Sequence, residues 1–127
     1  MKSLANAALA IVGLLHVWFF VLETFLWKTP LAGQMLKMSA EEASANAILA
    51  GNQGVYNAVV AAGLFWSLRA KNPVFALQLR VFFLTSVIAV GIYGAISARI
   101  LVLFVQVLPG ALALLFSILA ARSPQKV

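Results

Sequence analysis

Four long apolar runs occupy almost the whole chain and leave little room for anything else. They extend over about residues 4–27, 44–68, 74–98 and 100–121. A helix needs about 20 apolar residues to cross the hydrocarbon core of a bilayer, and only helices or closed barrels satisfy their backbone hydrogen bonds there. Four such runs in 127 residues predict an all-α fold, a four-transmembrane-helix bundle that forms a single integral membrane domain over residues 1–127.

Composition supports a membrane protein and excludes several other classes. Hydrophobic residues make up 64% of the chain and charged residues 9%, whereas soluble domains carry about 25% charged residues. The absence of Cys excludes disulfides, a thiolate nucleophile and Cys-based metal sites, and a single His excludes a His-rich metal site. We therefore expect no metal and no cofactor. The net charge of +6 comes from basic residues near the ends of the runs, which indicates membrane orientation and not nucleic-acid binding.

The distribution of basic residues predicts the orientation of the chain. Six basic residues fall on the side of the amino terminus, the second connection and the tail, and three fall on the opposite side. The positive-inside rule then places both termini in the cytoplasm. A signal peptide is the alternative for the first run, but the run contains His16 and Glu23, and no small-residue cleavage site follows Trp27. Arg80 is expected to snorkel to the cytoplasmic surface, and the tail RSPQKV is expected to be polar and disordered.

Local signals predict where two of the helices begin. Ser39 with Glu42 three positions later forms a capping box, so the second helix is expected to begin near Ala40, outside the hydrocarbon. Asn72 and Pro73 suit the N-cap and the first position of the third helix. The helices are therefore expected to begin slightly before the apolar runs that they contain.

Several residues outside the polar clusters have simpler expected roles. Trp27 and Trp66 fit the two interfacial aromatic belts. Apolar residues of the first connection, residues 28–43, such as Met35, are expected to lie on the membrane surface. Pro109 followed by Gly110 predicts a kink in the fourth helix and a freed backbone carbonyl.

Polar side chains inside the apolar runs mark the candidate site. Helical rise places His16 near the centre of its run and Glu23 about 11 Å toward the outer end. The other candidates fall within roughly 8 Å of the centre, nearly all on the outer side. The shared depth predicts one polar cavity in the outer half of the bundle. The residues expected to orient a ligand there are Asn52, Gln53, Tyr56, Asn57, Tyr93 and Gln106.

Glu23 and His16 are the candidate acid and base groups. Glu23 is the only acidic residue within the four runs, and a carboxyl group there is costly unless it is protonated, paired or hydrated. A pair with Arg99 is the alternative to a functional role. His16 lies seven residues earlier on the same face, about 10 Å away along the axis, so a substrate or water would have to bridge the two groups. For His16 the alternative is a buried, hydrogen-bonded histidine with no catalytic role.

The amide residues also have a structural alternative. Hydrogen bonds between membrane helices contribute about 0.6 kcal/mol each, and Asn or Gln side chains commonly make them. Small residues repeat every four positions behind the amides, which favours close approach of another helix. This small-residue ridge consists of Ala50, Gly54, Ala58 and Ala62.

The polar motifs and their order resemble those of a known family. The motifs are HVWFFVLETFLW from His16 to Trp27, NQGVYN from Asn52 to Asn57, GIYG from Gly91, and Gln106 with Pro109. Together they are similar to domain-of-unknown-function family 1304, over nearly the whole chain. Trp18 is a minor departure, since Tyr is expected there. The resemblance implies a small four-span protein of the bacterial inner (cytoplasmic) membrane, and it implies nothing about substrate.

Three hypotheses for function follow. In the first, the polar pocket binds, and in one version transforms, a small amphipathic or lipid-like molecule within the lipid bilayer. In the second, the chain is a proton-coupled small-molecule exporter that uses Glu23, although Glu23 lies far from the midplane that alternating access requires. In the third, it is an accessory subunit whose polar face binds another membrane protein. A homo-oligomer is also open, because the small-residue ridge could face a second copy.

Overall fold

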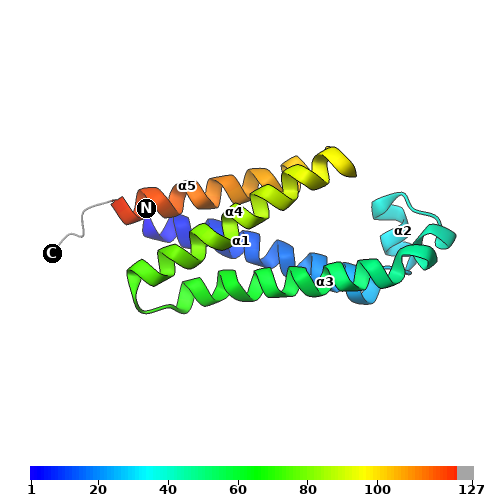
Figure 1. Cartoon of the computed structure of the whole chain (residues 1–127), viewed down its shortest axis with the longest axis horizontal. Coiled ribbons are helices and arrows are strands. Elements are labelled where there is room, and N and C mark those ends of the chain that lie inside the picture. Colours follow the sequence, from blue (N-terminus) through cyan, green and yellow to red (C-terminus); the bar gives the residue numbers. More distant parts are fainter. Residues whose placement is uncertain (123–127) are drawn as a thin grey trace. The chain divides into compact units, whose positions relative to one another are not determined.

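The computed structural model describes residues 1–122, which are helical apart from short connections (Figure 1). The tail for which the sequence predicts disorder lies, from residue 123 onward, outside the described residues. Helices labelled η have π geometry, in which each N–H bonds to the carbonyl five residues earlier. The elements in chain order are α1 (Lys2–Val21), η1 (Leu22–Leu26), α2 (Pro30–Leu36), α3 (Ala40–Arg69), α4 (Pro73–Ser97), η2 (Leu103–Val107) and α5 (Leu108–Arg122).

Four helices are long and apolar enough to cross a membrane, which confirms the predicted fold class and makes the chain a multi-pass membrane protein. They are Lys2–Leu26, Ala40–Arg69, Pro73–Ser97 and Leu103–Arg122. The fourth begins three residues later than the predicted residue 100. The cause is a tight turn in which the N–H groups of Val102 and Leu103 donate to the carbonyls of Arg99 and Ile100, at 3.0 and 3.1 Å.

The predicted helix starts are correct because local side chains determine them. The Glu42 carboxylate accepts from the Ser39 backbone N–H at 2.8 Å, and the Ser39 hydroxyl accepts from the Glu42 N–H at 3.1 Å. This reciprocal pair is the capping box, and α3 begins at Ala40. The Asn72 side chain accepts from the N–H groups of Val74 and Phe75 at 2.9 and 3.0 Å. Both contacts satisfy N–H groups that the first helical turn leaves unpaired.

The first connection contains a short helix, α2, that the apolar pattern does not predict. Thr29 caps it by accepting from the Ala32 N–H at 3.4 Å, and Pro30 occupies its first position. The helix ends at Lys37, which has a left-handed backbone with φ of 50°. The Thr-Pro pair is a local start signal of the same kind as Asn72-Pro73. Met35 is exposed on α2, and its contact with the membrane surface stays a prediction.

Contacts divide the chain into two compact units, and the single domain stays a prediction. The first unit comprises Met1–Gly13 and the chain from Ala62 onward, and the second comprises Leu14–Ala61. In the first unit α4 runs beside η2 and α5 (Figure 1). Gly91 allows this approach, because a Cβ added there would lie 2.7 Å from Val107.

Both π segments carry a polar residue that the sequence singles out. The first, η1, contains Glu23, and the second, η2, contains Gln106. In η2 the Leu108 N–H donates to the Leu103 carbonyl, five residues back. Pro109 follows directly, and a proline in an α-helix clashes with the carbonyl four residues earlier, here that of Val105. The irregularity expected at Pro109 therefore takes the form of a π turn immediately before it.

Candidate polar site around Glu23

A hydrogen bond between Glu23 and Asn57 is the centre of the candidate site in the second unit. The Asn57 Nδ2 donates to the Glu23 Oε2 at 2.7 Å and also to the Gln53 backbone carbonyl at 3.3 Å. Glu23 and Asn57 are both partly buried. The bond joins residues that are 34 positions apart, so tertiary packing and not local sequence brings this carboxyl and this amide together.

Gly54 allows α3 to approach η1 closely enough for that bond. A Cβ added at Gly54 would meet the Thr24 hydroxyl in direct overlap, and it would lie 3.2 Å from both the Glu23 Cβ and the Phe20 carbonyl oxygen. The Phe20 oxygen belongs to the backbone and cannot move aside as a flexible side chain would. Gly54 lies three residues before Asn57. Because Gly54 has no side chain, α3 can lie close enough to η1 for the Asn57 amide to reach Glu23.

Two polar atoms on residues that follow Glu23 within four positions are buried and lack a hydrogen-bond partner among residues 1–122. They are the Thr24 Oγ1, which packs against Gly54, and the Trp27 Nε1. Sequence analysis missed both as site residues and assigned Trp27 to the interfacial belt. Their positions in the sequence were the available signal, since Thr24 follows Glu23 directly and Trp27 lies four positions after it. Buried polar groups are usually hydrogen-bonded, so these two need an explanation.

The remaining candidates in the second unit lie in different environments. Asn52, Gln53 and Tyr56 are exposed, and 61% of the Tyr56 surface is accessible. His16 is 2% exposed, and its ring packs edge-on against Phe19 with centroids 5.7 Å apart. Glu23 is hydrogen-bonded to Asn57, so the structure brings two of the candidate residues into contact, and the roles of Glu23 and His16 as acid and base stay predictions.

The four residues of the small-residue ridge differ in burial. Ala50 and Gly54 are buried and Ala58 is half-buried, but Ala62 is exposed, and its neighbour Ala61 is buried instead. A spacing of four exceeds one helical turn of 3.6 residues, so a stripe that follows it drifts around the helix. The buried face of α3 changes to a spacing of three near Ala58 for this reason.

Tyr93 and Gln106 both belong to the first unit. Tyr93 is 72% exposed on α4. The Gln106 Nε2 donates to the Val87 backbone carbonyl at 3.1 Å, which joins η2 to α4. That contact is of the helix-to-helix kind that the sequence leaves open for the amides. A ligand-binding role for either residue stays a prediction.

The chemistry available around Glu23 suits a polar ligand group. A carboxyl group accepts hydrogen bonds, or donates one when it is protonated, while amides do both and an indole N–H only donates. The cluster can therefore hold a group with both donors and acceptors, such as a hydroxyl, an amide or an amine. Among the described residues no group of three or more His, Cys, Asp or Glu side chains is arranged to hold a metal ion.

Four apolar helices that carry a carboxyl-amide contact define a four-span helical membrane protein with polar groups inside its spans. Comparison with protein families gives a match over residues 10–118 to DUF1304, described as a protein of unknown function, and the chain belongs to this family. The family resemblance read from the sequence motifs is thus confirmed. No curated protein and no solved structure matches the chain.

Proposed function

We propose that the second unit binds the polar head of a small amphipathic or lipid-like molecule beside Glu23. The observation that carries this proposal is the 2.7 Å bond from Asn57 to Glu23; Trp27, four residues after Glu23 in the sequence, adds a buried Nε1 without a partner among the described residues. A ligand acceptor that reached the indole N–H would remove the cost of an unsatisfied buried group, about 1–3 kcal/mol. The apolar helices on either side would receive the ligand's hydrocarbon part.

The exposed amides of α3 extend the same surface. Gln53 lies four residues before Asn57 and therefore near it on the same face of α3, Asn52 lies on the adjacent stripe of the helix, and both are exposed. In a bilayer these amides would face hydrocarbon unless a polar molecule met them, and such exposure is costly. Together with Glu23 they offer a carboxyl group and several neutral donors and acceptors to one head group. If the bound molecule is also transformed, Glu23 is the candidate proton donor or acceptor, with His16 as the second candidate.

The proposal is tested by asking what co-purifies with the full-length protein. Wild type, Glu23→Gln, Asn57→Ala and Gln53→Ala are purified from bacterial inner membranes in a mild detergent, and bound molecules are extracted and identified by mass spectrometry. We expect a species present with wild type and depleted at least about fivefold in Glu23→Gln and Asn57→Ala, because each loses a charge-assisted hydrogen bond.

Asn46→Ala is the matched control. Asn46 is an exposed amide on α3 that donates to the Glu42 carbonyl of its own helix at 3.0 Å, so its removal should leave the bound species unchanged. If Glu23→Gln, Asn57→Ala and Gln53→Ala all retained the species and the wild-type melting temperature, the proposal would be wrong. Proton-dependent flux in proteoliposomes that Glu23→Gln abolishes would favour the exporter in its place.

Binding of another membrane protein is a second candidate, favoured by the exposed phenols in the spans. Tyr56 and Tyr93 are 61% and 72% exposed, and a tyrosine hydroxyl facing hydrocarbon needs a hydrogen-bond partner. This candidate predicts that Tyr56→Phe weakens a complex, seen by size-exclusion chromatography with light scattering as a shift to the monomer. If the wild-type protein were already monomeric and co-purified with no other chain, this candidate would fail.

A further inference from the structure

A cavity of about 500 Å³ lies in the first unit, at the end that holds α1's amino terminus and the connection between α3 and α4. It is separate from the Glu23 cluster, because all of its lining residues belong to the first unit. Its polar lining consists of three basic residues, one amide and two hydroxyls. These residues are Lys2, Asn6, Ser67, Lys71, Arg80 and Ser117.

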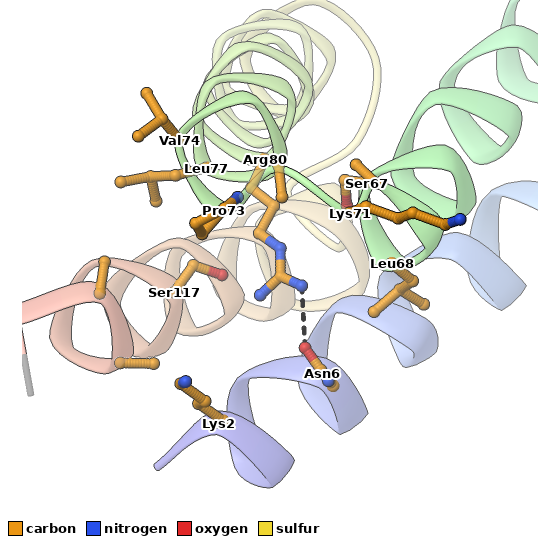
Figure 2. Close-up of a pocket in the computed structure, with 14 residues that line it drawn as sticks. Lys2, Asn6, Ser67, Leu68, Lys71, Pro73, Val74, Leu77, Arg80 and Ser117 are labelled. Carbon is orange, nitrogen blue, oxygen red and sulfur yellow. Dashed lines mark hydrogen bonds between the residues drawn. The ribbon is translucent and has the colours of Figure 1, made fainter. Parts of the chain in front are cut away.

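Arg80 is the central residue of this cavity (Figure 2). It lies seven residues after Pro73, where α4 begins, and is therefore about 10 Å along the helix. One guanidinium nitrogen, Nη2, donates to the Asn6 Oδ1 at 2.9 Å. The Nε of the same group is buried and has no partner within residues 1–122. Snorkelling of Arg80 to the cytoplasmic surface stays a prediction, and the buried Nε adds a donor without a partner among the described residues.

Ser117 on α5 supplies a second unsatisfied group to the same cavity. Its side chain is 1% exposed, and its Oγ has no partner in the described part of the chain. Figure 2 shows the hydroxyl directed into the space beside Arg80. Ser67, in contrast, already donates to the Leu64 carbonyl at 2.6 Å. Two donors from two different helices that line this cavity, Arg80 Nε and Ser117 Oγ, are thus without a partner among the described residues.

The first unit contains no acidic side chain that could neutralise these cations. The acidic residues of the chain are Glu23, Glu41 and Glu42, and all three belong to the second unit. Lys2, Lys71 and Arg80 therefore share one cavity that no acidic side chain of residues 1–13 or 62–122 lines. Charges held together in this way attract an anion, and arginine matches phosphate oxygens especially well because its planar donors bind two of them at once.

We propose that this cavity binds the phosphate group of an anionic phospholipid. Arg80 and Ser117 donate to the phosphate oxygens, and Lys2 and Lys71 supply positive charge around it. The rest of the lining is apolar and includes Leu68, Val74 and Leu77, which suits the acyl chains of a lipid better than a soluble anion. The location agrees with the positive-inside prediction, by which these basic residues face the cytoplasmic leaflet, the leaflet that carries anionic lipids.

The test measures binding of short-chain phosphatidylglycerol and phosphatidylcholine to the full-length protein in neutral detergent, by native mass spectrometry. We expect phosphatidylglycerol to bind at least about tenfold more tightly than phosphatidylcholine. Arg80→Gln should weaken the binding of phosphatidylglycerol at least about tenfold. Arg80→Lys keeps the charge but loses the planar donors, so it should restore only part of the affinity.

Arg69→Gln is the matched control, because Arg69 is exposed at the end of α3 and does not line the cavity. Loss of a basic residue near an anionic surface costs about fivefold at most through general attraction. Equal losses in Arg69→Gln and Arg80→Gln would overturn the proposal in favour of diffuse electrostatics. Equal affinity for the two lipids would overturn it as well.

Ser117→Ala keeps the proposal testable if Arg80 variants fail to fold. Removing a buried hydroxyl without a partner should leave the lipid-free melting temperature unchanged or raise it. The same variant should weaken phosphatidylglycerol binding about two- to tenfold, as expected for one hydrogen bond. An unchanged affinity would contradict a phosphate contact at Ser117. Binding of inorganic phosphate or glycerol phosphate as tight as that of the lipid would identify a soluble anion as the ligand and overturn the lipid assignment.

Discussion

At the scale of single residues, two glycines of α3, Gly51 and Gly54, lie in different surroundings. A Cβ at Gly54 would overlap the Thr24 hydroxyl and press on the Phe20 carbonyl, whereas a Cβ at Gly51 meets no atom within 4 Å. Glycine in a helix interior is less favourable than alanine by about 0.5–1 kcal/mol. Glycine at position 54 therefore makes the helix less stable than alanine would, and the close contact with η1 explains why a glycine is needed there. Gly51 has no such contact.

We predict that Gly54→Ala destabilises the protein by about 1–3 kcal/mol, because overpacking displaces α3 from η1. Gly51→Ala should instead stabilise it by about 0.5–1 kcal/mol through helix propensity alone. The free energy of unfolding in detergent, followed by circular dichroism, measures both changes. Two variants of the same sign and size would show that Gly54 is not in tight contact with η1.

At the scale of elements, the start of α3 depends on the capping box of Ser39 and Glu42. Ser39→Ala should cost about 1 kcal/mol, because the Glu42 N–H loses its acceptor. Ser44→Ala, at an exposed position within the same helix, is the control and should change stability by less than about 0.5 kcal/mol. Hydrogen exchange of the first turn of α3 provides the local measurement. Equal protection in the two variants would contradict a capping role for Ser39.

The π turn of η2 makes a separate prediction about Gln106. Pro109→Ala restores an N–H and removes the clash with the Val105 carbonyl, so the segment is expected to relax to an α-helix. That change rotates Gln106 by about 100° and breaks its bond to the Val87 carbonyl. Gln106→Ala should then cost about 0.6 kcal/mol in the native background and nearly nothing in Pro109→Ala. A double-mutant cycle measures the coupling, and additive effects would refute the relaxation.

The sequence predicts the helix starts that nearby residues determine. It does not predict the contacts that depend on how distant helices pack. The starts at Ala40 and Pro73 follow from caps within a few residues. The Glu23–Asn57 contact depends on helices brought together from 34 positions apart, and a common depth could suggest it without specifying it. The unsatisfied Trp27 Nε1 and the pairing of Arg80 with Asn6 were not predictable, because burial of a single atom depends on what surrounds it.

At the scale of the whole molecule, the acidic side chains are distributed unevenly along the chain. Every acidic side chain belongs to residues 14–61, and the sequence predicts that both termini lie in the cytoplasm. Because the chain has no Cys, single cysteines can report the topology without removing native thiols. Gln34→Cys should react with a membrane-impermeant maleimide added outside intact cells, and Ser3→Cys should react only after lysis. The reverse pattern would invert the predicted orientation.

The two π segments also have a consequence for how the length of this chain can vary. A bond to the fifth residue back encloses one more residue than the bond of an α-helix. Leu22–Leu26 and Leu103–Val107 therefore each hold one residue that a regular helix would not need. Removing one residue there would preserve the faces that the flanking helices present, whereas the same deletion in the middle of α3 would turn everything beyond it by about 100°. Family members that are one residue shorter within a span are expected to have their gaps at these two segments.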